Sequence, residues 1–176
     1  MLLRCMLRLA LAAAVGGSHG KHVLCACYGI RFTETDYSVP IENPSGIFIY
    51  SKAKTLAEAA AWEYVRGQQR TNPDHYDMVT MNPATCVGAI LTPEVRSSTK
   101  LIYAIFMNLL PGLLNMSYNL VHIQDVADAH VLALEKPQAG GERYLLCGGQ
   151  RHAREVARVL QQEFEPQVRA REWVGG

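Results

Sequence analysis

The chain has 176 residues, 49% of them hydrophobic, and its 17 Lys+Arg nearly balance its 16 Asp+Glu. That length suffices for one domain with a hydrophobic core. The near-neutral charge and the scattered basic residues exclude the basic patch by which proteins bind nucleic acid or anionic membranes. We therefore expect a small-molecule ligand, with no nucleic-acid or membrane partner, and the oligomeric state stays open.

The first 20 residues allow two interpretations. Residues 1–17 are apolar and include Arg4 and Arg8. A signal peptide would use the arginines as its basic region and keep only residues 9–15 as its apolar core. Because Arg8 shortens the apolar run, we favour a helix followed by a glycine-rich turn over residues 1–20. No stretch reaches the roughly 20 apolar residues that a membrane-spanning helix needs.

The five cysteines are an odd number, and no Cys-x-x-Cys pair occurs among them. Cys25 and Cys27 lie in an apolar run, two residues apart, so they would share one face of a strand. A metal site would need two further ligands at a suitable spacing, which we do not find. Reduced, buried cysteines are the simpler interpretation, and they predict a cytoplasmic protein without a bound metal.

Strand-like and helix-like segments alternate after residue 20. The patterns predict strands over 21–27, 76–81, 118–123 and 142–147, and helices over 50–66, 97–110, 124–135 and 151–164. Residues 28–44 read as a loop, Gly67 is expected to close the first of these helices, and 165–176 read as a tail. Such alternation predicts an α/β domain with a Rossmann-like, doubly wound parallel sheet and helices on both of its faces. Ligands of such sheets bind at the carboxyl ends of the strands.

Tyr50 and Lys54 lie four residues apart at the start of a predicted helix, so they share one helix face. Lowering the pKa of a phenol from about 10 to about 7 requires about 4 kcal/mol, and a nearby ammonium group provides part of it. A phenol tuned in this way can protonate a carbonyl oxygen while a hydride reaches the carbonyl carbon. The alternative is an ordinary packed tyrosine and a solvated lysine, because the two-residue pattern alone is common.

Residues 50–63 (Tyr-Ser-Lys-Ala-Lys-Thr-Leu-Ala-Glu-Ala-Ala-Ala-Trp-Glu) resemble the active-site helix of the extended short-chain dehydrogenase/reductases, in the NAD-dependent epimerase/dehydratase superfamily. The branch that they resemble contains dihydroflavonol reductase, cinnamoyl-CoA reductase and methylglyoxal (aldehyde) reductase. Four more segments resemble family motifs in the same order: 32–37 ("TE-x-D-W"), 81–88 ("NP"), 120–130 ("DVA-x-AH") and 141–144 ("GERY"). The resemblance covers roughly residues 21–164.

The resemblance implies an NADP(H)-dependent oxidoreductase that acts on a ketone or aldehyde, or on the corresponding alcohol; NAD(H) stays open as the cofactor. It assigns the acid/base role to Tyr50, and to Lys54 the roles of supporting that phenol and holding the nicotinamide ribose. The further cofactor contacts that it implies are Pro83, Ala84, Cys86 and Ser98. For Asp125 and His130 we expect structural roles, as a helix cap and a packed histidine.

Two departures from the family pattern leave other functions open. Cys25-Ala26-Cys27 stand where the family has Thr-Ser-Ser, so the serine that holds the substrate carbonyl is replaced, and Tyr28 is another source of a hydroxyl. We find no Gly-x-x-Gly-x-x-Gly between a first strand and a first helix, where the family binds the pyrophosphate. We therefore expect the catalytic middle of a reductase, without the first βαβ unit. The alternatives are a non-catalytic remnant and a nucleotide-sugar epimerase or dehydratase, which shares the Tyr-xxx-Lys pair.

Overall fold

The structure is a computed structural model that describes residues 23–25, 30–38, 42, 47–90, 98–107, 109–113 and 115–164. The expected helix and turn over 1–20, the expected tail and residues 26–28 lie outside these ranges. The elements in chain order are β1 (Val23–Cys25), β2 (Ile30–Phe32), α2 (Ile47–Thr71), β3 (Thr80–Pro83), β4 (Thr85–Val87), α3 (Ser98–Phe106), β5 (Ser117–His122), α4 (Ile123–Glu135), the short 3-10 helix η1 (Pro137–Ala139), β6 (Arg143–Leu146), β7 (Gly149–His152) and α5 (Ala153–Phe164).

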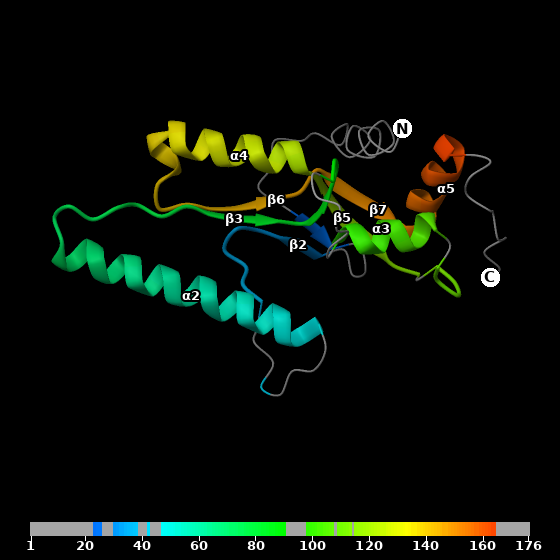
Figure 1. Ribbon diagram of the computed structural model, residues 1–176. Coiled ribbons are helices and arrows are strands. Elements are labelled where there is room, and N and C mark those ends of the chain that lie inside the picture. Colours follow the sequence, from blue (N-terminus) through cyan, green and yellow to red (C-terminus); the bar gives the residue numbers. More distant parts are fainter. Residues whose placement is uncertain are drawn as a thin grey trace.

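The described strands form three small sheets. β3 pairs in parallel with β6, and β4 pairs in parallel with β5. β7 lies antiparallel to β5, and β1 lies antiparallel to β2. Helices α2 and α4 lie on opposite sides of the β3–β6 pair (Figure 1). The expected α/β class, with parallel strands and helices on both sides, is therefore confirmed.

Helix α2 is longer than the sequence predicts. It runs from Ile47 through Gly67 to Thr71, so the expectation that Gly67 closes it was wrong. A glycine inside a helix costs only about 1 kcal/mol, which a helix of 25 residues rich in Ala, Leu, Glu and Lys can tolerate. The helix ends where Pro73 follows Asn72, because a proline disfavours the helical conformation of the residue before it.

Strand β3 starts later than predicted and includes Asn82 and Pro83, which lie beyond the predicted end at residue 81. Pro83 is opposite Leu146 in the parallel register, at the last position of the strand. A proline cannot donate a ladder hydrogen bond, but the end of a strand tolerates one. The next residue, Ala84, donates its N–H to the carbonyl of Leu146 at 2.9 Å and continues the pairing.

Three other boundaries differ from the prediction. The predicted loop over 28–44 contains β2, which pairs with β1. The predicted helix over 151–164 begins only at Ala153, because the residues before it pair with β5 as β7. The helix predicted over 97–110 ends at Phe106.

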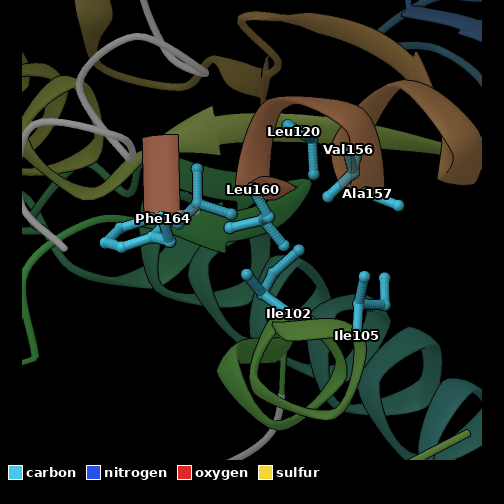
Figure 2. Close-up of a cluster of buried hydrophobic side chains, with 8 residues drawn as sticks. Ile102, Ile105, Leu120, Val156, Ala157, Leu160 and Phe164 are labelled. Atoms are coloured by element: carbon cyan, nitrogen blue, oxygen red, sulfur yellow. The ribbon is translucent and has the colours of Figure 1, made fainter. Parts of the chain in front are cut away.

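One hydrophobic cluster joins α3 and α5 to the sheet that contains β4, β5 and β7. Its buried members are Val87, Ile102, Ile105, Leu120, Val156, Ala157, Leu160 and Phe164. Figure 2 shows Ile102 of α3 and Leu160 of α5 pointing toward one another. Phe106 meets Phe164 edge to face, with the ring centroids 5.1 Å apart. This cluster therefore holds α3 and α5 on the sheet, whereas the β3–β6 pair and α2 depend on other contacts.

Across the ranges that the structure describes, we find no helix with both the length and the apolar character needed to cross a bilayer.

Candidate functional site

Tyr50 and Lys54 lie on one face of the first turns of α2, as the spacing predicts. The Nζ atom of Lys54 lies 5.7 Å from the centroid of the Tyr50 ring, which is a cation–π distance. The Tyr50 side chain is 63% exposed, and Lys54 is also exposed. Both groups can therefore be reached by a ligand.

The pair borders a cleft of about 680 Å³ between α2 and β3. Asn82 and Pro83 form part of the wall opposite the helix, and Tyr37 and Ser38 come from the loop after β2. A cleft of this size is within the range that holds small-molecule ligands. Its wall offers the ammonium of Lys54, the phenol of Tyr50 and the amide of Asn82 as polar groups.

A second cleft of about 470 Å³ adjoins the first, because the two share Tyr37, Ser38, Asn82, Pro83 and Arg143 in their walls. Its other wall comes from β5 and β6 and includes Asn119. The Oδ1 atom of Asn119 is buried and accepts no hydrogen bond from the described part of the chain. A buried acceptor without a donor is unfavourable, and this atom has almost no accessible surface by which a ligand in the cleft could reach it.

The four further residues expected at the cofactor are not all brought to these clefts. Pro83 borders both clefts and Ala84 borders the second one. Cys86 borders neither of them; its thiol donates to the Ala84 carbonyl at 3.5 Å, and burial raises the pKa of that thiol. Ser98 is the first residue of α3, and its side chain lies outside the described part of the structure.

The main-chain N–H groups at the end of β3 are not available to a ligand. Pro83 has no N–H, and the N–H of Ala84 is hydrogen-bonded to Leu146. A contact between these residues and a carboxamide would therefore have to use their carbonyl oxygens, which accept from the carboxamide nitrogen.

An ion pair that sequence reasoning missed lies beside the first cleft. The guanidinium of Arg143, at the start of β6, donates from Nε to Oε1 of Glu58 at 2.7 Å and from Nη2 to Oε2 at 3.4 Å. Oε1 of Glu58 also accepts from the Thr80 hydroxyl at 3.2 Å and from the Asn82 amide at 3.3 Å. We call these four side chains the Arg143 network. It ties the middle of α2 to both strands of the β3–β6 pair.

The same guanidinium holds the loop after β2. Its Nη1 atom donates to the carbonyl oxygens of Glu34 and Asp36, at 3.0 and 3.3 Å, and its plane lies 4.4 Å from the Tyr37 ring centroid. The N–H and hydroxyl of Thr33 donate to the Asp36 carboxylate at 2.6 and 3.0 Å. These two hydrogen bonds hold the pKa of Asp36 below its ordinary value. The loop that carries Tyr37 and Ser38 is thus fixed at the cleft.

The carboxyl of Glu58 is kept charged by its neighbours. Partial burial acts to raise its pKa, but the hydrogen bonds and the charge of Arg143 outweigh burial, with the help of Asn82 and Thr80. The pKa of Glu58 therefore lies below its ordinary value. The Arg143 network is ionic at neutral pH.

Three of the four network residues lie in segments that resemble family motifs: Glu58 in 50–63, Asn82 in 81–88 and Arg143 in the "GERY" segment. A fourth such segment, the loop over 32–37, accepts hydrogen bonds from Arg143. The sequence feature that could have indicated the Arg143 network is a charged residue inside an otherwise apolar or helix-forming run, as at Glu58 and Arg143. Charge in such a run predicts a partner, but the sequence does not say which one.

The fifth resembling segment, 120–130, has a structural role that differs in part from expectation. The N-cap of α4 is His122, whose Nδ1 accepts from the N–H of Gln124, so the expectation that Asp125 caps the helix was wrong. Asp125 lies in the first turn, where the helix dipole favours a carboxylate. His130 is exposed, not packed as we expected, and its Nδ1 lies 2.7 Å from the carbonyl of Val126 one turn earlier.

The described ranges contain no group of three or more His, Cys, Asp or Glu side chains that could hold a metal ion.

Comparisons with known proteins identify the family of the chain. A profile of the NAD dependent epimerase/dehydratase family matches residues 21–147. Cinnamoyl-CoA reductase CAD2 of Medicago truncatula is 39% identical over 118 residues, which cover 65% of this chain and 33% of that protein. An anthocyanidin reductase ((2S)-flavan-3-ol-forming) of Vitis vinifera is 31% identical over 142 residues, which cover 76% of this chain and 39% of that protein. The chain thus spans between a third and two fifths of the length of these relatives.

A solved structure of yeast methylglyoxal/isovaleraldehyde reductase Gre2 complexed with NADPH has a similar fold. The TM-score is 0.62 at 21% identity, and the match covers 76% of this chain and 40% of that one. At this identity the likeness concerns the fold alone, and it confirms the expected Rossmann-like arrangement.

Proposed function

The chain belongs to the NAD dependent epimerase/dehydratase family, and from this premise we propose that it carries the chemistry of an NADP(H)-dependent reductase of ketones or aldehydes. The observation that carries the proposal is the Tyr50–Lys54 pair on the wall of a cleft of about 680 Å³. The names of the relatives, which are reductases, support this reaction over sugar epimerisation.

In the proposed reaction the Tyr50 hydroxyl gives its proton to the carbonyl oxygen of the substrate and takes one back in the reverse direction. Lys54 stabilises the resulting phenolate by its charge, because opposite charges one helical turn apart attract. The dinucleotide, when bound, supplies or accepts the hydride. The exposed position of Tyr50 allows the substrate carbonyl to reach the phenol from the cleft.

The cofactor contacts follow from the placement of the side chains. We assign Lys54 to the hydroxyls of the nicotinamide ribose, and the carbonyl groups of Pro83 and Ala84 to the carboxamide. Cys86 borders neither cleft, so its proposed effect on the cofactor is indirect: its thiol donates to the Ala84 carbonyl. Ser98 stays a proposed contact. NADPH is the expected cofactor, and the complex of a structural neighbour with NADPH supports that choice.

The second cleft is the proposed position of the substrate. It adjoins the first cleft, and the Asn119 side chain forms part of its wall. We further propose that the chain forms one Rossmann-like domain and acts in the cytoplasm on a small carbonyl compound.

The test is NADPH binding by the 176-residue chain, followed by nucleotide fluorescence and by thermal shift. Lys54→Met should weaken binding about tenfold, because it removes a charged hydrogen-bond donor. Lys52→Met is the matched control, because the Lys52 ammonium donates to the Glu42 carbonyl at 2.9 Å and does not border the cleft. Lys52→Met should leave binding unchanged.

Equal losses in the two lysine variants would place the nucleotide somewhere else. Absence of binding at millimolar NADPH would refute the reductase function for this chain and favour the non-catalytic alternative.

A further inference from the structure

Three side chains of α2 follow one another along the face that borders the cleft. Tyr50, Lys54 and Glu58 are spaced at i, i+4 and i+8, and all three border the first cleft. Lys54 is therefore one helical turn away from the phenol on one side and from a carboxylate on the other. Its ammonium can pair with either group, and only the phenol is part of the proposed acid pair.

In the structure the Lys54 ammonium lies beside the Tyr50 ring. Its Nζ atom is 5.7 Å from the Tyr50 ring centroid. The carboxylate of Glu58 pairs with Arg143 and, among the described residues, not with Lys54. The Thr80 hydroxyl and the Asn82 amide also donate hydrogen bonds to Oε1 of Glu58. The carboxylate that could attract Lys54 is thus already satisfied.

We propose that Arg143 is a positioning residue for the acid pair: by occupying the Glu58 carboxylate, it leaves the Lys54 ammonium beside Tyr50. The inference rests on the proposed function of Tyr50 and Lys54 and adds a residue that acts through them. Arg143 touches neither of the two directly in this role, because it works through Glu58.

Arg143 is well held for this purpose. Its Nη1 atom is fixed by the carbonyl oxygens of Glu34 and Asp36, and its plane is stacked on Tyr37. The side chains of Arg143 and Glu58 are only 12% and 13% exposed, so water screens their charges weakly. Without the guanidinium, a poorly hydrated carboxylate would remain, and Lys54 is the cation one turn away from it.

Two other charged groups that the structure describes near this face have partners of their own. The Lys52 ammonium donates to the Glu42 carbonyl, and the Asp36 carboxylate accepts from Thr33. Among the described residues of the α2 face that borders the cleft, the charged groups on which the proposal depends are Lys54 and Glu58, with Arg143 as the partner of Glu58.

The experiment follows the titration of Tyr50 in the 176-residue chain by NMR of ¹³C-labelled tyrosine, with Tyr50→Phe to assign the signal. We expect Arg143→Gln to raise the titration midpoint of Tyr50 by about half a pH unit, the size of an exposed charge contact. Arg143→Lys and the double variant Glu58→Gln/Arg143→Gln keep the charges balanced, and both should titrate as the wild type does.

The Lys54→Met background separates positioning from a direct effect of the Arg143 charge. In that background Arg143→Gln should no longer shift the midpoint. A shift of the same size there, or the same shift in either charge-balanced variant, would overturn the proposal. Circular dichroism identifies variants that do not fold. If Arg143→Gln does not fold, the two charge-balanced variants, Arg143→Lys and Glu58→Gln/Arg143→Gln, provide the test. If Arg143 were only a structural anchor, the titration midpoint of Tyr50 would shift in both of them.

This measurement needs neither cofactor nor turnover. A chain that fails to bind NADPH but shows the expected titration pattern would refute the reductase function and leave the positioning intact. The reverse result would refute the positioning alone.

Discussion

The Nε atom of Arg143 lies 2.7 Å from Oε1 of Glu58, although 85 positions separate the two residues in the chain. The pair joins the first residue of β6 to the middle of α2, the helix whose first turn carries Tyr50. Because Thr80 and Asn82 of β3 bond the same carboxylate, one ion pair sets the position of the helix relative to both strands. Three segments that resemble family motifs, 50–63, 81–88 and 141–144, thus meet at this ion pair.

The first prediction concerns the stability that this pair contributes. Arg143→Met should destabilise the chain by about 2–4 kcal/mol, because it leaves a partly buried carboxylate without its partner. The double variant Glu58→Met/Arg143→Met should lie closer to the wild type, because no unpaired charge remains. Arg70→Met, which removes an exposed arginine in the last turn of the same helix, should change stability by less than about 1 kcal/mol. Urea unfolding measures all of these values.

The second prediction concerns pH. The folded-state pKa of Glu58 lies below its ordinary value, which is about 4.3 in an unfolded chain. A group with a lowered pKa stabilises the folded state above its unfolded-state pKa, and this stability is lost as the pH falls through the folded-state pKa. Wild type should therefore exceed Glu58→Gln in stability at neutral pH, and the gap should narrow below about pH 4.3.

Urea unfolding at several pH values between neutral and acid checks this second prediction. Glu135→Gln, at the exposed end of α4, is the control and should follow the wild-type curve. A gap between wild type and Glu58→Gln that stays constant with pH would show that the carboxylate charge is not what Arg143 stabilises.

Local patterns predicted the parts of the fold that local interactions determine. The composition of α2 and the spacing of Tyr50 and Lys54 located the cleft-lining face, and α4 begins within one residue of its predicted start. The resemblance identified the family, which the match over residues 21–147 confirms. Neither pattern required knowledge of a distant contact.

The sequence did not predict β2, β4 and β7, because very short strands and strands paired over long sequence distances leave little local pattern. Strands β2 and β4 have three residues each, too few for a periodic pattern, and β7 exists because Gly149–His152 pair with residues of β5. The ion pair of Arg143 likewise could not be predicted, because it depends on how close the fold brings Arg143 to Glu58. A motif contains the residue, but only the packing of β6 against α2 gives it a partner.

The third prediction compares two glycines. Gly88 has φ +147, and an added Cβ would lie 2.5 Å from Cγ2 of Ile123. Gly88→Ala should therefore destabilise the chain by about 2–3 kcal/mol, because both the backbone conformation and the contact are unfavourable. Gly67 lies inside α2 with nothing within 4 Å of an added Cβ, so Gly67→Ala should stabilise by about 0.5–1 kcal/mol. If urea unfolding showed that both glycine variants are stabilised, or that both are destabilised, the predicted difference between Gly88 and Gly67 would be wrong.

The fourth prediction concerns the cluster that joins α3 and α5 to the sheet. Leu160 is 1% exposed, so Leu160→Ala should cost about 2–5 kcal/mol through lost contacts and a cavity. Leu134 is 90% exposed on α4, and Leu134→Ala should change stability by less than about 0.5 kcal/mol. The two variants remove the same atoms, so their difference in unfolding free energy measures burial alone. Similar values would mean that α5 does not pack as Figure 2 shows.

The last prediction tests the acid role itself. Tyr50→Phe removes one oxygen and keeps the ring that Lys54 contacts, so NADPH affinity should stay unchanged. Carbonyl reduction with NADPH should fall by about 10²–10⁴-fold, which is the usual contribution of a general acid. Tyr64→Phe is the control, because Tyr64 is a 58% exposed tyrosine of the same helix that does not border the cleft. A similar loss in both variants would point to a change in α2 as a whole, and unchanged turnover in Tyr50→Phe would remove the phenol from the proposed reaction.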